Sequence, residues 1–440
     1  MSHGADRVWS VSEHLDSILG QVRPLDPIEL PLLDAQGCVL VNDVTVPVSL
    51  PPFDNSAMDG YAVRAADVQA ATAEHPAVLE VIGDVAAGLD ELPQVGPGHA
   101  ARIMTGAALP PGAEAIVPVE WTDGGAGAGS ADSMAPYTAD PSGAAGEVRV
   151  HRPAAVGQFV RERGSDVAAG ELALAAGTVL GPPQIALLAA IGRGTVVVRP
   201  RPRVVVLSTG SELVPPGAEL GPGRIYDSNS YALTAAAQAA GAVAYRVGAV
   251  PDQVETLRAA IEDQLVRADV IVTSGGVSVG AYDVVKEALT SLGGSFGEHA
   301  EEAAGHVEFR RLAMQPGKPQ GFGRIGPDRT PLLALPGNPV SAYVSFELFV
   351  RPVIRTLMGA KDVHREVVQA ACTQAVEGSP EGRRQFLRGR YDKQSGTVTP
   401  VGGAESHLVG ALARADALIV VPEAVTAFAA GTEVDVVVLD

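Results

Sequence analysis

The apolar positions near the start of the chain recur with the period of an α-helix. We expect this helix at residues 12–22, with one apolar face made of Val11, Leu15, Ile18, Leu19 and Val22. Ser10 and Glu13 are spaced as in a capping box, in which each side chain accepts a hydrogen bond from the other residue's backbone N–H. The pattern therefore predicts the helix and also where it begins.

From about residue 39 to residue 150 the pattern changes to short strand-like runs separated by Pro and Gly. The clearest runs are 44–48, 77–82 and 113–119, and together they predict a β-rich module. Residues 124–146 are mainly Gly, Ala and Ser, so we expect a mobile surface insertion there. A further β-like stretch at 158–177 is expected to pack back near the N-terminal helix.

The middle of the chain alternates between strands and helices. Strands are expected at 203–208, 243–250, 268–273, 306–314 and 332–335, and helices at 229–240, 253–265, 284–292 and 340–358. Such alternation predicts a mainly parallel sheet covered by helices on both faces. Residues 362–440 return to strands, such as 417–421 and 434–439, and predict a small β domain.

The composition is that of a globular protein, with 46% hydrophobic and 19% charged residues. At about 150 residues per domain, a chain of this length predicts about three domains. The net charge of −19 argues against nucleic-acid binding, because a face that binds a duplex must be basic. A small anionic ligand remains compatible with it, since local backbone N–H groups and a few cations can hold a phosphate.

Nothing in the sequence predicts export or membrane insertion. The polar stretch at residues 1–9 lacks the apolar core of a signal peptide, and no apolar run approaches roughly 18 residues. The two cysteines, Cys38 and Cys372, lie far apart and outside any metal-binding spacing, so we expect two buried free thiols. We therefore expect a cytoplasmic protein.

Three of the expected strands are followed by loops of small residues. The loops are Ser208-Thr209-Gly210-Ser211-Glu212, Ser274-Gly275-Gly276-Val277-Ser278, and Pro336-Gly337-Asn338-Pro339-Val340-Ser341. The carboxyl ends of parallel strands meet at one edge of a sheet, where ligands bind. One such loop is more often a plain turn, but small residues let backbone N–H groups approach an anion. Three loops together predict a phosphate-binding edge.

Carboxylates lie among these loops, at Glu212, Asp227 and Asp283. Hard oxygen ligands beside a phosphate pocket indicate Mg²⁺. Alternatives stay open, because Asp227 could cap the helix expected at 229 and Glu212 could be a solvated loop residue. Lys318 sits in a turn stiffened by Pro and Gly that could aim its cation at an oxyanion, although a lone loop Lys is usually solvated.

The β-rich module carries a second polar cluster, Phe53-Asp54-Asn55-Ser56-Ala57-Met58-Asp59-Gly60-Tyr61-Ala62. Arg102 and Thr105 follow later and add a cation and a hydroxyl. Taken singly, Asp54 and Asn55 could form an Asx turn and Arg102 a surface ion pair. The residues alone thus predict a Mg²⁺-dependent site for a phosphate ester or a nucleotide-like ligand, and they do not name the substrate.

The sequence resembles the molybdopterin molybdenumtransferase family, known as MoeA in bacteria and as the E domain of gephyrin in animals. The resemblance rests on residues 53–62 and on Leu335-Pro336-Gly337-Asn338-Pro339-Val340-Ser341, and it covers nearly the whole chain. Supporting matches lie at 102–106, 161–166, 208–213, 225–229, 274–283 and 316–319. Residues 117–121 are similar to the actinobacterial branch called gephyrin-like molybdotransferase.

The resemblance implies a multidomain fold of α/β and β parts. It implies an elongated linker domain at 1–45 and 151–180, an inserted β domain at 46–150, a central three-layer α/β molybdopterin-binding domain at 181–359, and a C-terminal β-barrel-like domain at 360–440. It also implies an elongated homodimer, with the site between the central domain of one subunit and the inserted domain of the other.

The resemblance further implies a Mg²⁺-dependent enzyme that inserts molybdate into adenylylated molybdopterin and releases AMP. Catalytic roles would fall on Asp59 and Thr105 of the partner chain, and on Asp227, Asp283 and Lys318. The metal would be held by Asp227, Asp283 and Glu212. The substrates would contact Ser208, Thr209, Gly210, Ser274, Gly275, Gly276, Ser278, Pro319, Pro336, Gly337, Asn338, Pro339, Ser341, Arg383 and Ser406. No histidine or cysteine is expected to act as a base or nucleophile.

Three positions depart from the family pattern. Ser211 stands where an Asp is common, Ala281 where an acidic residue usually precedes the Tyr-Asp pair, and Gln315 where a Lys is frequent. The first two departures remove carboxylates, and the third removes a cation. We therefore expect them to affect the geometry of the metal site and the affinity for molybdate, and not the fold.

Two other functions are compatible with the sequence. One is a gephyrin-like dimeric scaffold that binds peptides of partner proteins, for example in cell division. The other is the molybdopterin adenylyltransferase of the same pathway, whose single domain resembles the central α/β domain. That enzyme usually carries Gly-Gly-Thr-Gly where this chain has Gly275-Gly276-Val277-Ser278, and it lacks the flanking β domains.

Overall fold

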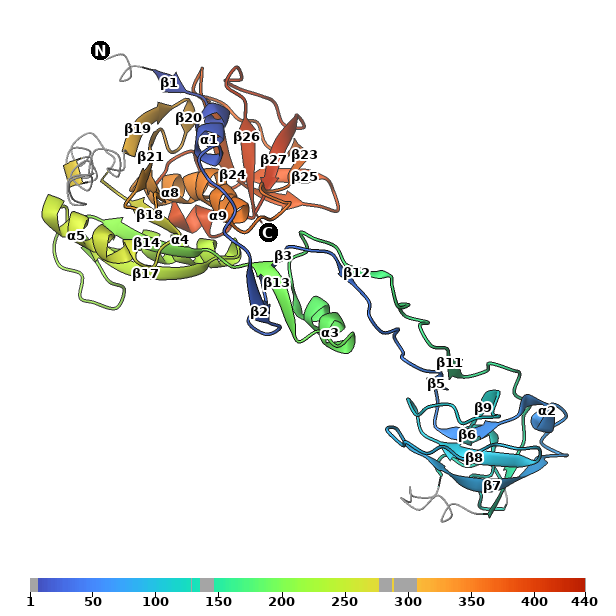
Figure 1. The fold of residues 1–440 in the computed structure, drawn as a ribbon. Coiled ribbons are helices and arrows are strands. Elements are labelled where there is room, and N and C mark those ends of the chain that lie inside the picture. Colours follow the sequence, from blue (N-terminus) through green and yellow to red (C-terminus); the bar gives the residue numbers. More distant parts are fainter. Residues whose placement is uncertain (1–6, 128, 135–145, 277–286, 289–306, 440) are drawn as a thin grey trace.

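The computed structural model describes residues 7–127, 129–134, 146–276, 287–288 and 307–439. The molecule is elongated, with a large α/β body beside a β-barrel at one end and a β module at the other (Figure 1). Two thin antiparallel ladders join these ends. In them β4 (Val44–Thr45) pairs with β12 (Leu172–Leu174), and β5 (Asn55–Ser56) pairs with β11 (Val160–Arg161).

A seven-stranded sheet forms the centre of the α/β body, in the order β1-β19-β21-β22-β18-β14-β17. Its strands are β1 (Val8–Trp9), β14 (Arg203–Thr209), β17 (Val243–Val250), β18 (Val270–Ser274), β19 (Val307–Leu312), β21 (Pro319–Ile325) and β22 (Thr330–Leu335). The pairs within β17, β14, β18 and β22 are parallel, and so is the pair of β1 with β19. Since only β21 runs against its neighbours, the prediction of a mainly parallel sheet is confirmed.

Helices cover both faces of this sheet, as predicted. One face packs against α1 (Val11–Leu19), α4 (Asn229–Ala239) and a continuous helical run made of α8 (Pro339–Ser345), a π-helical turn η4 (Phe346–Val350) and α9 (Arg351–Leu357). The other face packs against α5 (Val254–Leu265). Strand residues therefore alternate between two cores, with Val204 and Val206 in the first and Val205 and Leu207 in the second.

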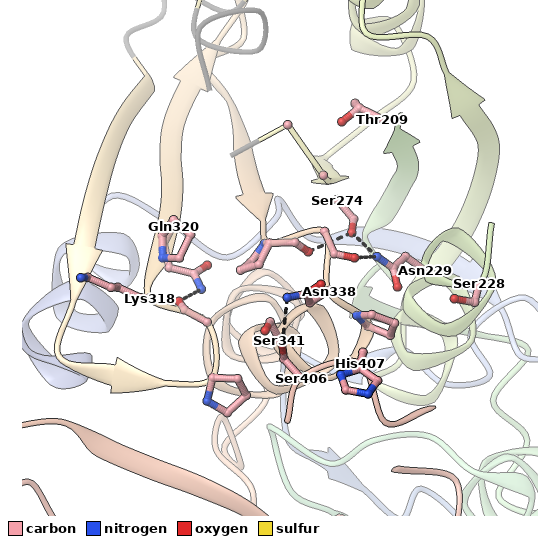
Figure 2. Close-up of a pocket in the computed structure, with 18 of the residues that line it drawn as sticks. Thr209, Ser228, Asn229, Ser274, Lys318, Gln320, Asn338, Ser341, Ser406 and His407 are labelled. Carbon is pink, nitrogen blue, oxygen red and sulfur yellow. Dashed lines mark hydrogen bonds between the residues drawn. The ribbon is translucent and has the colours of Figure 1, made fainter. Parts of the chain in front are cut away.

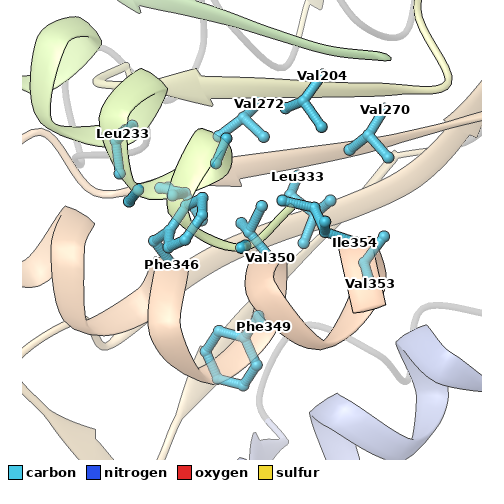
Figure 3. Packing of buried hydrophobic residues seen from close by; sticks show 14 of the residues in the cluster. Val204, Leu233, Val270, Val272, Leu333, Phe346, Phe349, Val350, Val353 and Ile354 are labelled. Atoms are coloured by element: carbon cyan, nitrogen blue, oxygen red, sulfur yellow. The ribbon is translucent and has the colours of Figure 1, made fainter. Parts of the chain in front are cut away.

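The larger core shows how the sheet holds the helical run in place (Figure 3). Val204, Val270 and Val272 point from the strands toward Phe346, Val350 and Ile354. All six side chains are fully removed from solvent. Burying each one contributes about 1.5–3 kcal/mol, so this contact fixes where α8 begins at the edge of the sheet.

The N-terminal helix forms with the predicted capping box. The Glu13 N–H donates to Ser10 Oγ at 3.1 Å, and the Ser10 N–H donates to Glu13 Oε2 at 2.9 Å. The helix ends at Leu19, before the predicted residue 22, because Gly20 caps it.

The predicted packing of residues 158–177 near this helix is wrong. These residues pair with β4 and β5, while α1 packs against α9.

Between the body and the ladders lies a small sheet of β2 (Ile28–Pro31), β13 (Thr195–Arg199) and β3 (Val39–Leu40), with α3 (Pro182–Ala190) packed on it. At the far end, the β module is a five-stranded sheet in the order β10-β7-β8-β6-β9. Its strands are β6 (Gly60–Val63), β7 (Ala77–Val85), β8 (His99–Ile103), β9 (Ala115–Pro118) and β10 (Gly146–Val150), and the short helix α2 is Ala65–Val68. The four-domain boundaries given above stay a prediction.

The C-terminal segment is a closed β-barrel. Its strands are β23 (Val367–Cys372), β24 (Arg384–Asp392), β25 (Thr397–Pro400), β26 (Ala417–Val421) and β27 (Glu433–Val438). The sheet closes because β24 pairs with β26 as well as with β25. A short strand of the body, β20 (Met314–Gln315), pairs with β24 and attaches the barrel to the α/β body. The predicted β-barrel-like domain is confirmed.

Some expectations fall partly or wholly outside the described residues. They are the helix at 284–292, of which only residues 287 and 288 are described, and much of the insertion at 124–146. Cys38 and Cys372 are buried and free, as predicted. Among the helices that the structure describes, none is long and apolar enough to cross a membrane.

A buried ion pair stabilises the β module. Arg102 and Asp84 lie on adjacent strands, and Arg102 Nη2 donates to Asp84 Oδ2 at 2.6 Å. Both side chains are almost fully buried, at 7% and 1% exposed. The sequence left open whether Arg102 is a cation of a binding site or forms a surface ion pair. The structure shows an ion pair, but it lies in the interior of the β module.

We predict that Asp84→Ala destabilises the β module by about 3–5 kcal/mol, because the change leaves the Arg102 charge buried without this carboxylate. Urea unfolding followed by Trp121 fluorescence measures this, in a Trp9→Phe background that leaves Trp121 as the sole tryptophan. The exposed Glu91→Ala is the matched control. Equal unfolding midpoints for the two variants would contradict the prediction.

Candidate functional site

The pocket lies along the edge of the central sheet where β14, β17, β18 and β22 end. Because β21 runs antiparallel to β22 and β19 antiparallel to β21, the start of β21 and the end of β19 reach the same edge. The cavity there has a volume of about 1570 Å³. That exceeds the roughly 300–1,000 Å³ of ordinary ligand pockets, so a large ligand fits with room for additional protein groups.

The three glycine-containing loops meet at this edge, as predicted, and Thr209, Gly275 and Gly337 all line the cavity. The Gly275 N–H donates to Leu335 O at 3.1 Å. A Cβ atom on Gly275 would lie 2.3 Å from Thr209 O, and a Cβ on Gly337 would lie 3.4 Å from the Gly275 Cα. The loops are thus in direct backbone contact, which a side chain on Gly275 would prevent.

Asn229 joins two of these loops to the first turn of α4 (Figure 2). Its side-chain N–H groups donate to Ser274 Oγ at 2.8 Å and to Gly337 O at 2.7 Å. Ser274 Oγ in turn donates to Pro336 O at 3.2 Å. One amide therefore fixes the spacing between the loops after β18 and β22.

The C-terminal barrel supplies another wall of the pocket. Asn338 Nδ2 donates to Ser406 Oγ at 2.8 Å, and the Val340 N–H donates to Ser406 O at 3.0 Å (Figure 2). Arg388, buried inside the barrel, donates to the carbonyl oxygens of Gly403 and Glu405. Arg388 thereby holds the loop that presents Ser406 to the central sheet.

Carboxylates line the side of the pocket near β14 and β17. Glu212 folds back over Gly210, where a Cβ atom would lie 2.8 Å from each carboxylate oxygen. Asp252, which follows β17, has a buried Oδ1 without a hydrogen-bond partner among the described residues. Burial first, and then the Glu212 charge, raise the pKa of Asp252. Burial and a neighbouring like charge both disfavour the ionised form of a carboxyl group. Among the residues that the structure describes, no group of three or more His, Cys, Asp and Glu side chains is arranged to hold a metal ion.

Asp227 lines the same side but is almost fully buried, and it also caps α4. Its Oδ1 accepts from the Ser230 N–H at 3.1 Å, and its Oδ2 accepts from Ser230 Oγ. The helix-cap reading of Asp227 is therefore observed. Each carboxylate oxygen of Asp227 has a further lone pair that a metal ion could use, and the role of Asp227 as a metal ligand stays a prediction.

The structure brings most of the predicted site residues to the cavity. Those that line it are Thr209, Glu212, Asp227, Ser274, Gly275, Gly276, Lys318, Pro319, Pro336, Gly337, Asn338, Pro339, Ser341 and Ser406. Ser208, Gly210 and Arg383 do not line it, although Ser208 and Gly210 flank Thr209. Ser278 and Asp283 lie outside the described residues.

Asp59 and Thr105 lie together, but in the β module at the far end of the molecule (Figure 1). Asp59 Oδ1 accepts from the Thr105 N–H at 2.6 Å and from Thr105 Oγ1 at 2.9 Å. Both residues are exposed. They form one polar patch that this chain does not bring to its own pocket.

Several lining residues were not predicted from the sequence. Asp252 directly follows a predicted strand, so the rule that found the other loops also applies to it. Arg310 and Arg311 lie inside a strand that was predicted from its apolar residues. His407 also lines the pocket, and the expectation that no histidine acts as a base or nucleophile stays a prediction.

The fold and the pocket define a class of protein. It is a multidomain α/β protein whose parallel strands present glycine-rich loops, carboxylates and a lysine at one edge, the arrangement that holds phosphorylated ligands. Comparison with known families agrees with that class. The chain matches three family models: "MoeA N-terminal region (domain I and II)" at residues 9–192, "Probable molybdopterin binding domain" at 205–356, and "MoeA C-terminal region (domain IV)" at 373–439.

Relatives match along most of their length. A protein of Mycobacterium tuberculosis named molybdopterin molybdenumtransferase 2 is 46% identical over 427 residues, which are 97% of this chain and 98% of that protein. The molybdopterin molybdenumtransferase of Bacillus subtilis is 33% identical over 402 residues, 91% of this chain and 87% of that one. The chain therefore belongs to the MoeA family, as predicted.

A solved structure supports the same assignment. The crystal structure of the molybdopterin biosynthesis MoeA protein of Pyrococcus horikoshii has a TM-score of 0.72 and 32% sequence identity. The match covers 99% of this chain and all of that chain, at 100%. The fold is therefore that of the family across the whole molecule.

We predict that Gly275→Ala disrupts the contact between the loops. The new Cβ would meet Thr209 O, at a residue whose φ of +101° already disfavours a side chain. Gly217→Ala is the matched control, because Gly217 has a φ of +90° and no neighbour within 4 Å. The control should lose about 1–3 kcal/mol for its backbone conformation, and Gly275→Ala clearly more. Urea unfolding followed by circular dichroism measures both, and equal losses would show that the loops do not touch.

Proposed function

We propose that the protein is a molybdopterin molybdenumtransferase, which inserts molybdate into adenylylated molybdopterin and releases AMP. The observation that carries the proposal is the meeting of three glycine-containing strand ends. Glu212 and Asp252 follow the strands on one side of these ends, and Lys318 precedes β21 on the other side. Backbone N–H groups of such loops can orient a pyrophosphate, and Lys318 can offset charge on an oxyanion. The names of the relatives mention molybdopterin and the transfer of molybdenum. We place this activity in the cytoplasm.

We propose Mg²⁺ as the metal of the reaction, beside Glu212 and Asp252. Mg²⁺ is usually held by one or two carboxylates together with phosphate oxygens and water. The unpaired Asp252 Oδ1 fits such a cation, and Asp227 lines the same side. Thr209 is 4% exposed, and its Oγ1, which has no hydrogen-bond partner within the described ranges, adds another possible oxygen ligand. Mg²⁺ would neutralise charge on the phosphoanhydride.

The chain's own residues would then position the reacting groups. The loops at Thr209, Gly275 and Gly337 would orient the phosphoanhydride for attack by a water oxygen on one phosphorus. The P–O–P bond would then break, AMP would leave, and the pterin would keep its own phosphate. Lys318 lines the pocket and forms no ion pair with any described residue, so its charge is available to molybdate. Ser406 and Pro319 would lie near the dithiolene sulfurs that receive the metal. Arg383 would reach this place only if its exposed side chain turned inward.

We further propose that the protein works as a homodimer. Asp59 and Thr105 lie together in the β module, and the linker ladders keep them away from the pocket of their own chain (Figure 1). A second chain could bring its own Asp59 and Thr105 to this pocket. The large cavity leaves space for such groups.

We predict that Lys318→Ala lowers kcat/KM for AMP release from adenylylated molybdopterin by about 100-fold, because one charge-stabilising donor is lost. The assay contains molybdate and Mg²⁺. Lys393→Ala, in an exposed barrel turn, is the control and should behave as the wild type. A folded wild-type protein that releases no AMP would contradict the transferase function and favour the scaffold alternative.

We predict that mixed dimers recover activity when Asp59→Asn and Lys318→Ala lie on different chains. If each site combines Asp59 of one chain with Lys318 of the other, one site of the mixed dimer is intact and the other carries both defects. Co-expression with two affinity tags isolates the mixed dimer for the AMP-release assay. Activity no higher than that of either single variant would contradict a site shared between chains.

A further inference from the structure

A buried amide side chain follows the turn that carries Lys318. Gln320 is the second residue of β21, it lines the pocket, and it is only 1% exposed. It shares a face of the strand with Phe322, which packs in the larger hydrophobic core. Burying an amide beside apolar side chains costs free energy unless its polar atoms form hydrogen bonds. The hydrogen bonds of Gln320 therefore indicate why an amide stands at this position.

Gln320 donates two hydrogen bonds, each to a different part of the protein. Its Nε2 donates to Gly317 O at 2.7 Å and to Ser345 Oγ at 2.6 Å. Gly317 belongs to the turn before β21, and Ser345 is the last residue of α8. Because a carbonyl oxygen can only accept, the bond to Gly317 fixes which end of the amide faces the turn. One buried side chain thus links the turn to the helix.

The turn also approaches α8 closely. A Cβ atom on Gly317 would lie 2.9 Å from Ser345 Oγ and 3.3 Å from Gln320 Nε2, and Gly317 has a φ of +97°. This approach leaves little room for a side chain at Gly317. On the other side, the Leu312 N–H donates to Lys318 O at 2.8 Å. The backbone around Lys318 is therefore held by β19 on one side and by Gln320 on the other.

The helix that receives this link leads to the phosphate-binding side of the pocket. It begins at Pro339, shortly after Gly337 of the loop that follows β22. Because Ser345 belongs to the same helix, Gln320 relates the turn at Lys318 to that glycine loop. In the close-up, Gln320 and Lys318 lie at the same side of the pocket (Figure 2).

We propose that Gln320 is a positioning residue, which holds the turn at Lys318 against α8 and thereby sets the distance from Lys318 to the loop at Gly337. A lysine side chain is long and flexible, so a fixed backbone limits where its ammonium group can reach. Gln320 acts through Lys318 and needs no contact with a substrate. This inference rests on the transferase function proposed above, and it adds the residue that places one of its charges.

The test compares Gln320→Leu and Ser345→Ala with Gln264→Leu, which removes a buried amide of α5 outside the pocket. AMP release gives kcat/KM for each variant, with and without Lys318→Ala in the same chain. For Gln320→Leu we expect kcat/KM to fall about tenfold, but less than about twofold in the Lys318→Ala background, where the group on which Gln320 acts is gone. Ser345→Ala keeps the bond to Gly317 and should lose about threefold. Gln264→Leu should match its parent in both backgrounds.

Hydrogen exchange measured by mass spectrometry adds a readout that does not depend on activity. In Gln320→Leu, exchange in the segment at 314–321 should become about tenfold faster, because the turn is no longer held against α8. Gln264→Leu should leave this segment unchanged. Unfolding midpoints verify that each variant is folded, and the milder Ser345→Ala carries the test if Gln320→Leu does not fold.

The outcomes separate this inference from the function on which it rests. If the wild type releases AMP and folded Gln320→Leu keeps its kcat/KM, the positioning role is overturned. It is also overturned if the losses from Gln320→Leu and Lys318→Ala simply multiply. If the wild type releases no AMP, the transferase function fails, and unchanged exchange at 314–321 in Gln320→Leu then overturns the link between the turn and α8 as well.

Discussion

The pocket depends on the close approach of three backbone segments at Gly275. Its N–H donates to Leu335 O, and the space that a side chain would need is taken by the backbone of Thr209. This contact is available only because β14, β18 and β22 are adjacent and parallel, so their carboxyl ends coincide. The buried valines beneath the sheet keep the strands in that register. The chemistry at the edge is thus a consequence of the packing below it.

The same sheet order also distributes the charges. Carboxylates follow the strands on one side of the glycine loops, and cations accompany the strands on the other. The β module adds a different constraint. Its Asp59–Thr105 patch is held at the end of two thin ladders, away from the pocket of the same chain.

The sequence predicts the elements whose signals are local. The capping box at Ser10 and Glu13, the strand at 243–250 and the helix at 229–240 follow from periodicity and caps, and they form within one or two residues of their predicted ends. The strand β21 was missed because its Pro and Gly residues read as a loop. Local patterns also do not predict that β24 pairs with β26 and closes the barrel, because this pairing joins residues that are distant in the sequence. The composition of the loops likewise predicted that Thr209, Gly275 and Gly337 lie at the pocket. Asp252 was not predicted, although it directly follows a predicted strand, because the loop after that strand lacks glycine.

The proposed transfer reaction requires the three loops to hold one metal-bound pyrophosphate together. Hydrogen exchange measured by mass spectrometry, with and without Mg²⁺ and pyrophosphate, tests it most directly. Exchange should slow in the segments at 208–212, 274–276 and 335–341 at the same ligand concentration. Protection of one segment without the others would contradict a shared phosphate site.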